Sequence, residues 1–84
     1  MNYRLSDHAI KQIGDRNIPI DWLEQVINLP EQVIEQSDKS KVYQSKLVRP
    51  NIKTYLLRVF VNDKVDPLVV ISVYLTSKVN KYWA

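Results

Sequence analysis

The residues that could do chemistry in this chain are one histidine, several basic side chains and a group of hydroxyls late in the sequence. They are His8, Arg16, Lys46, Arg58, Tyr74, Thr76, Ser77, Lys78, Lys81 and Tyr82. Cleavage of RNA without a metal needs a group that takes the 2′-hydroxyl proton, cations that stabilise the pentavalent phosphate, and an acid for the leaving 5′-oxygen. These residue types supply all three roles, although many basic domains of this size contain a similar set.

Arg58 is the most informative of these groups because it interrupts the otherwise apolar run of residues 53–61. A guanidinium in such a strand needs either an anion or solvent on the open side of its sheet. An anionic ligand meets this need, and so does an acid such as Glu35 on a neighbouring strand. Both interpretations stay open, and under the first Lys78 is a second cation for the phosphate.

His8, Tyr74 and Arg16 each have two interpretations. His8 falls in the first turn of an expected helix, where it is either a proton acceptor or a half-exposed histidine with a local hydrogen bond. Tyr74 stacks on a base or donates a proton, or else it packs against Tyr43 or Phe60 on a neighbouring strand. Arg16 ends the helix, where interaction with the helix C-terminus is the simpler interpretation.

Composition excludes several classes of protein. The chain has 84 residues, with no cysteine, one histidine and one glycine. These counts leave no disulfide framework, thiolate metal site or glycine-rich phosphate loop, and we predict neither a metal nor a cofactor. No apolar run approaches the ~20 residues that span a bilayer, so no membrane partner is expected. The sequence therefore predicts one cytoplasmic domain over residues 1–84.

The charge is unevenly distributed along the chain. Its net value is +3, but residues 1–36 hold three Lys or Arg and six acids, whereas residues 37–84 hold nine and three. The second half is therefore strongly basic, which favours a polyanionic partner such as nucleic acid. Solubilising lysines at strand edges are the alternative explanation.

Two helices are expected in the first third of the chain. Ser6 is a good N-cap for a helix reaching about Asp15, which Asn17 and Pro19 end. A second helix begins at residues 19–21 and ends at Pro30. Asp21 and Glu24 resemble a capping box, but Pro19 could equally occupy the first helical turn. Its expected apolar face comprises Trp22 or Leu23, Val26, Ile27 and Leu29.

Strands are expected from residue 32 onward, over residues 32–36, 41–48, 53–61 and Leu68–Thr76, with polar turns at residues 37–40 and 49–51. Residues 1–5 are a short lead-in at the sheet edge. The predicted fold is α+β, with two N-terminal helices packed on one face of a roughly four-stranded antiparallel sheet. Alternation assigns to the covered face Tyr55, Leu57, Val59, Val61, Val69, Ile71, Val73 and Leu75. It assigns to the open face Arg58, Ser72, Tyr74 and Thr76, with Gln44 and Lys46.

The order of motifs along the chain resembles a known prokaryotic family. The first half contains His8-Ala9, then Arg16-Asn17-Ile18-Pro19, then Val26-Ile27-Asn28-Leu29-Pro30-Glu31. The second half contains Val42-Tyr43-Gln44, Leu57-Arg58-Val59, Val70-Ile71-Ser72-Val73-Tyr74, Thr76-Ser77-Lys78 and Lys81-Tyr82. This pattern is similar to an uncharacterised prokaryotic domain family that itself resembles BrnT and RelE-type toxins. Asn17 stands where that family usually has glycine, and both residues tolerate the left-handed conformation.

The resemblance implies a toxin of a type II toxin–antitoxin system. Such toxins are commonly metal-independent RNA endonucleases, and a small cognate antitoxin covers the active face. Together with the chemistry above, this gives the catalytic candidates His8, Arg58, Tyr74 and Lys78. The RNA-binding candidates are Arg16, Lys46, Thr76, Ser77, Lys81 and Tyr82.

The expected partners are therefore RNA, including ribosome-associated RNA, and the antitoxin. The alternative is a non-catalytic protein-interaction or nucleic-acid-binding module of the same fold, because RelE-like folds also include gyrase inhibitors. The sequence leaves the oligomeric state open.

Overall fold

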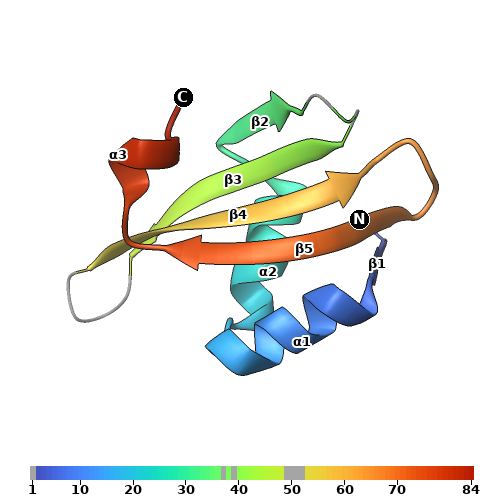
Figure 1. Ribbon diagram of the computed structural model, residues 1–84, viewed down its shortest axis with the longest axis horizontal. Helices are drawn as coiled ribbons and strands as arrows, with labels where there is room; N and C mark the ends of the chain where they lie inside the picture. The colour runs from blue at the N-terminus through green and yellow to red at the C-terminus, as the bar shows by residue number, and fades with distance from the viewer. Residues whose placement is uncertain (1, 37, 39, 49–52) are drawn as a thin grey trace.

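The computed structural model describes residues 2–36, 38, 40–48 and 53–84, and its fold is α+β (Figure 1). Along the chain the elements are β1 (Tyr3–Leu5), α1 (Asp7–Arg16), α2 (Ile20–Asn28), β2 (Gln32–Glu35), β3 (Lys41–Val48), β4 (Thr54–Asn62), β5 (Leu68–Thr76) and α3 (Val79–Tyr82). The strands form one sheet in the order β1-β5-β4-β3-β2. β1 runs parallel to β5, and the other neighbours are antiparallel. The predicted class is thus confirmed, but the sheet is mixed and has a fifth strand, formed by the lead-in.

The two N-terminal helices begin and end for local reasons. Ser6 caps α1 by accepting a hydrogen bond from the Ala9 amide at 3.0 Å, and Asn17 ends it in the left-handed region with φ 51°. The N-cap of α2 is Pro19, which has no side-chain capping bond. The predicted capping box at Asp21 is therefore wrong. The helix already begins at Ile20, because the fixed φ of Pro19 suits a residue at the start of a helix.

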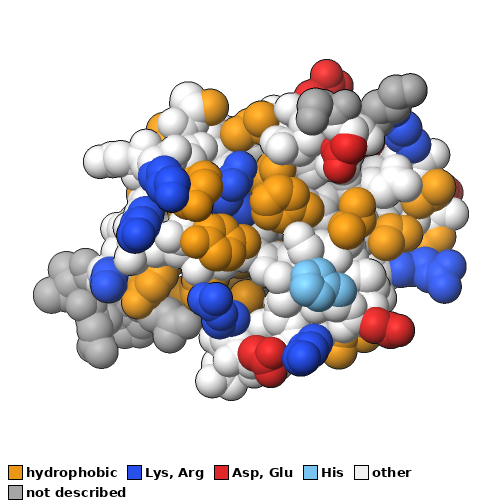
Figure 2. Space-filling model, viewed as in Figure 1, with side chains coloured by type: hydrophobic (Ala, Val, Ile, Leu, Met, Phe, Trp, Pro, Cys, Tyr) orange, Lys and Arg blue, Asp and Glu red, His pale blue; other side chains and the backbone are white. Residues whose placement is uncertain are grey.

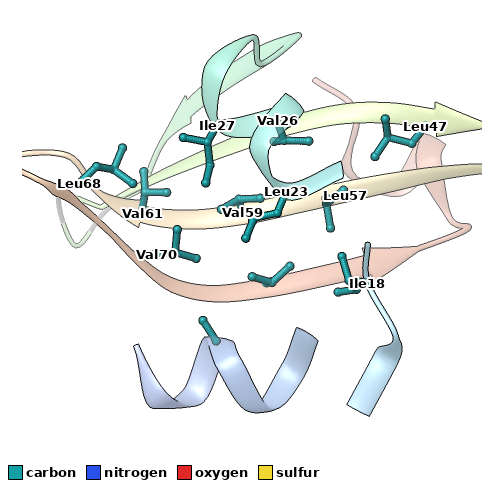
Figure 3. Packing of buried hydrophobic residues seen from close by; sticks show 12 residues of the cluster. Ile18, Leu23, Val26, Ile27, Leu47, Leu57, Val59, Val61, Leu68 and Val70 are labelled. Carbon is teal, nitrogen blue, oxygen red and sulfur yellow. The ribbon is translucent and has the colours of Figure 1, made fainter. Parts of the chain in front are cut away.

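The hydrophobic core lies between these helices and one face of the sheet (Figure 3). Leu23, Val26 and Ile27 of α2 are almost fully buried against strand residues such as Leu57 and Val59. Burying an aliphatic side chain of this size contributes about 1.5–3 kcal/mol. Leu29 was also expected on this apolar face, but it is 76% exposed. It lies beyond the last residue of α2, where helical periodicity no longer sets its direction.

A bulge in β5 reverses the predicted alternation in the first half of that strand. Phe60 pairs with Ser72 and Val61 pairs with Val70, which leaves Ile71 without a partner on β4. Leu68 and Val70 therefore join Val73 in the core, whereas Ile71 is 41% exposed. The covered-face prediction is wrong for Val69 and Ile71, and correct for Val73 and Leu75.

The bulge is held by the cap of α1. Ser6 donates from its amide to the Val70 carbonyl at 3.0 Å and from its hydroxyl to the Ile71 carbonyl at 2.7 Å. The predicted turn at 49–51 lies outside the described residues, as do two of the four residues of the turn at 37–40. Within the described part of the chain, no helix has the length and apolar character needed to cross a membrane.

Candidate nucleic-acid interface

A row of polar side chains crosses the face of the sheet opposite α1 and α2, which we call the open face. Gln32, Gln44, Arg58 and Tyr74 are consecutive cross-strand partners from β2 to β5, and we call them the polar row. Directly opposed residues point to the same face of a sheet, so the four side chains are neighbours. The predicted outward direction of Arg58, Tyr74 and Gln44 is confirmed.

The rows on either side of it are partly apolar. One row comprises Lys46, Leu56 and Thr76, and the other comprises Ile34, Val42, Phe60 and Ser72. Leu56 and Val42 are fully buried although they do not belong to the core beneath α1 and α2. The open face is therefore not a purely solvated surface, and part of it is covered.

The C-terminal segment covers it. The side-chain amide of Gln44 donates to Gln32 Oε1 at 2.7 Å and to the Tyr82 carbonyl at 3.2 Å. Gln32 in turn bonds both the amide and the carbonyl of Ala84. Gln44 is 0% exposed, and its Oε1 accepts from Arg58 Nε at 2.9 Å. A buried amide with all these partners fixes both the segment and the arginine.

Two aromatic rings lie close to the guanidinium group of Arg58, which is partly buried. Its Cζ lies 4.5 Å from the ring centroid of Tyr82 and 5.3 Å from that of Phe60. Desolvation by this burial lowers the pKa of Arg58, while Tyr82 and Tyr74 act in the opposite direction; an arginine nonetheless stays charged at neutral pH. Nε is used by Gln44, and neither Nη group has a hydrogen-bond partner among the described residues.

No acid forms an ion pair with Arg58 in the described part of the chain. Among the described residues the one ion pair joins Lys41 to Asp63 at 2.8 Å, and Glu35 does not reach Arg58. Of the two interpretations of this arginine, internal pairing with Glu35 is therefore wrong.

Tyr74 is bound to its neighbours through both its ring and its hydroxyl. Its ring meets that of Tyr82 edge to face, with centroids 5.8 Å apart and planes at 79°. Hydrogen bonding with the Tyr82 side chain and then with Thr76, together with the positive charges of Lys81 and Lys78, lowers the pKa of Tyr74. The expected aromatic partners Tyr43 and Phe60 are thus replaced by Tyr82, and Tyr43 packs against the core on the other face.

The remaining basic candidates gather on the same side. Lys46 Nζ lies 4.0 Å from the ring centroid of Trp83, and Lys81 Nζ lies 5.4 Å from that of Tyr82. Ser77 and Lys78 are exposed, and the Lys78 amide donates to Thr76 Oγ1 at 3.0 Å. Figure 2 shows basic and hydrophobic side chains mixed on this part of the open face. Such interleaving suits a nucleic-acid strand, whose phosphates meet cations and whose bases meet rings.

The two candidates on α1, His8 and Arg16, differ in how they relate to the polar row. His8 is exposed in the first turn of α1, and no hydrogen bond or ion pair joins it to the polar row among the described residues. Arg16, at the other end of the helix, lines a small pocket together with Tyr74. Arg58, Tyr74, Thr76 and Lys46 thus lie on the open face, with Lys78, Lys81 and Tyr82 beside them and Arg16 in a pocket wall shared with Tyr74.

Sequence reasoning missed Gln32, Phe60 and Trp83. Their contribution depends on strand register and on the folding back of the chain after Thr76. The polar row could have been found from the sequence only if the register of neighbouring strands had been predicted correctly. A hollow of about 430 Å³ lies at the other end of the sheet and has both acidic and basic walls, including Glu35, Lys41 and Asp63. Within the described residues no group of three His, Asp or Glu side chains could hold a metal ion.

The comparisons with known proteins give one match. A family model for a domain of unknown function, DUF4258, matches residues 5–75. This span contains the whole polar row but ends before Tyr82 and Trp83. No curated protein and no solved structure matches the chain. The resemblance to BrnT and RelE-type toxins therefore stays a prediction.

Proposed function

The chain belongs to the DUF4258 family, a domain of unknown function, and we propose that it binds RNA on the open face and cleaves it without a metal ion. The observation that carries this proposal is the state of Arg58. Two rings lie close to its guanidinium and Gln44 accepts a hydrogen bond from Nε, yet both Nη groups are unpartnered among the described residues. A charge kept in this way has an anion as its natural ligand.

A phosphate fits this environment better than a planar stacking ligand. Tyr82 and Phe60 already lie against the guanidinium, whereas its Nη groups have no partner among the described residues, so we expect a ligand to approach along the Nη edge. That edge offers parallel N–H donors, which match two oxygens of a phosphate. Lys46, Lys78 and Lys81 add positive charge nearby, and the rings of Tyr82 and Trp83 offer surfaces for bases.

The proposed reaction is transfer of the phosphate to the adjacent ribose hydroxyl. The ionised Tyr74 oxygen takes the 2′-hydroxyl proton, because its lowered pKa makes it a better populated base than an ordinary tyrosine. The 2′-oxygen forms a bond to phosphorus while the bond to the 5′-oxygen breaks, and Lys78 gives a proton to that leaving oxygen. Arg58 stabilises the charge on the pentavalent phosphate. The products are a 2′,3′-cyclic phosphate and a 5′-hydroxyl, and solvent restores both proton states.

In this proposal His8 has no catalytic role, because it lies on α1 and no hydrogen bond joins it to the polar row among the described residues. The biological setting we propose is a cytoplasmic toxin of a type II toxin–antitoxin system, acting on free or ribosome-associated RNA. A small antitoxin would block it by covering the open face. The resemblance in sequence supports this setting, and so does the exposed basic surface.

The test is incubation of the purified protein with RNA in the presence of EDTA. We expect fragments that end in a 2′,3′-cyclic phosphate, and a rate about 100-fold or more lower for Arg58→Ala. Tyr74→Phe should be similarly impaired, whereas Arg4→Ala, an exposed arginine on β1, serves as the matched control. Intact RNA, or equal cleavage by the wild type and Arg58→Ala, overturns the proposal.

The second candidate is a module that binds RNA or protein without cleaving. The hydrogen bonds that hold the C-terminal segment over Gln32 and Gln44 favour it, because they restrict access to the polar row. It predicts RNA retention in a gel-shift assay that depends on Arg58, with no new RNA ends.

A further inference from the structure

A pocket of about 200 Å³ lies between the end of α1 and the outer edge of β5. Its walls are Gln12, Asp15, Arg16, Val73, Tyr74 and Leu75. Tyr74 is the cross-strand partner of Arg58, so the pocket adjoins the proposed phosphate position. Neighbouring strands are about 4.8 Å apart, a distance within the span of one nucleotide.

The edge of β5 offers backbone groups to this pocket. β1 pairs only with Leu68 to Val70, so the rest of β5 has no strand on its outer side. The Val73 amide donates to Gln12 Oε1 at 2.7 Å and therefore points outward. Alternate residues of an antiparallel strand point the same way, so the Leu75 amide and carbonyl also point outward. Neither has a hydrogen-bond partner on that side among the described residues.

The volume suits a single base and not a whole nucleotide. At ~30 Å³ for each water molecule in the liquid, the pocket holds roughly six or seven waters, about the space of one planar ring system. Two adjacent residues of its wall, Asp15 and Arg16, have a carboxylate and a guanidinium as their side-chain groups. A carboxylate accepts a pair of N–H groups, and a guanidinium donates to a pair of acceptors.

Guanine is the base that fits this pair of groups. It presents the acceptors O6 and N7 on one side, which arginine recognises as a pair, and it carries N–H donors at N1 and N2 on the other. Adenine lacks the second donor pair, and the pyrimidines lack the N7 acceptor. We propose that this pocket binds guanine, so that RNA is held with a guanine beside the phosphate at Arg58.

The position of that phosphate rests on the proposed function, but recognition of the base does not require cleavage. The test is therefore direct binding of the four ribonucleoside 5′-monophosphates to the full chain by calorimetry. We expect GMP to bind at least about 10-fold more tightly than AMP, CMP or UMP, as one bidentate pair provides. Asp15→Asn should remove most of this preference and leave AMP binding unchanged. Asp7→Asn, an exposed acid at the other end of α1, is the matched control.

A second variant and an RNA-cleavage assay distinguish a failure of this inference from a failure of the proposed function. Arg16→Lys keeps the charge but loses the paired donors, and it should also lose the preference for GMP. Selective GMP binding without RNA cleavage overturns the proposed function and leaves this inference standing. Equal binding of all four nucleotides overturns the inference that the pocket binds guanine. If the protein then cleaves RNA with no preference for guanine, only the proposed RNA cleavage is supported.

Discussion

At the scale of single residues, Arg58 shows how a charge is kept available inside a small domain. Phe60 and Tyr82 lie close to its guanidinium and Gln44 accepts from Nε, so the two Nη groups are left for a ligand. Burial of a charge is costly unless it is compensated. Here the compensation comes from neutral groups, which leave the positive charge uncancelled, whereas a carboxylate would have neutralised it.

Gln44 is the residue that aims Arg58, and replacing it tests this arrangement. We expect Gln44→Leu to weaken RNA binding although Gln44 is fully buried and touches no ligand. Arg58 and the Tyr82 carbonyl each lose a partner, so stability should also fall by about 1–3 kcal/mol. RNA titration and urea denaturation measure the two effects. Gln25→Leu, at an exposed position of α2, is the control, and a variant with weakened stability but unchanged RNA affinity would show that Gln44 has no positioning role.

The hydroxyl of Tyr82 should control the ionisation of Tyr74. Hydrogen bonding from Tyr82 is the largest cause that lowers the pKa of Tyr74, ahead of Thr76 and the lysines. Tyr82→Phe keeps the ring over Arg58 but removes the hydroxyl, so the pKa of Tyr74 should rise toward its ordinary value of 10.0. The limb of the profile over which cleavage increases with pH should then move to higher pH, because Tyr74 acts as the base only when it is ionised.

Tyrosine Cζ chemical shifts, followed by NMR against pH, report the ionisation of each ring separately. Lys81→Ala should raise the pKa of Tyr74 by less than Tyr82→Phe does, because the lysine is a smaller cause. A cleavage profile that stays in place while the pKa of Tyr74 rises would exclude Tyr74 as the base.

At the scale of elements, the bulge in β5 separates what the sequence could predict from what it could not. Alternation correctly placed Tyr74 and Thr76 on the open face, because no irregularity interrupts the strand after Ser72. The same alternation failed at Val69 and Ile71, since an extra residue leaves no mark in a run of β-branched side chains. The bulge is instead marked by Ser6, which donates two hydrogen bonds to β5. These bonds join residues more than sixty positions apart in the sequence, so the sequence pattern does not reveal them.

We therefore expect Ser6 to contribute more to the stability of the fold than a residue that only caps a helix. Ser6→Ala removes the capping bond to Ala9 and the bond that fixes the Ile71 carbonyl. We expect a loss of about 1–2 kcal/mol in the free energy of unfolding, measured by urea denaturation. Ser77→Ala changes an exposed serine without a hydrogen bond among the described residues, and it should have almost no effect. Equal stability of the two variants would mean that the bulge needs no support from Ser6.

At the scale of the whole molecule, the uneven charge of the chain becomes a difference between two faces. The acidic first part supplies β1, α1, α2 and β2, and its two helices cover one side of the sheet. The basic second part supplies β3 to β5 and α3, whose polar side chains occupy the open face. The folding back of Tyr82 and Trp83 onto that face could not be predicted, because it depends on contacts with Gln44 and Lys46 far away in the sequence.

The salt dependence of RNA binding should reveal how many of these cations meet phosphates. For a single strand, each phosphate contact contributes about 0.7 to the slope of log affinity against log salt concentration. Replacing Lys46, Lys78 and Lys81 together by glutamine should therefore reduce the slope by about 2. Lys64→Gln is the control, because Lys64 is exposed at the other end of the sheet, beside the acidic side chain of Asp63. The slope is measured by RNA-binding titrations at several salt concentrations. If it falls as much for Lys64→Gln as for each of the other lysines, net charge attracts the RNA. If it falls only for Lys46, Lys78 and Lys81, the RNA strand follows the open face.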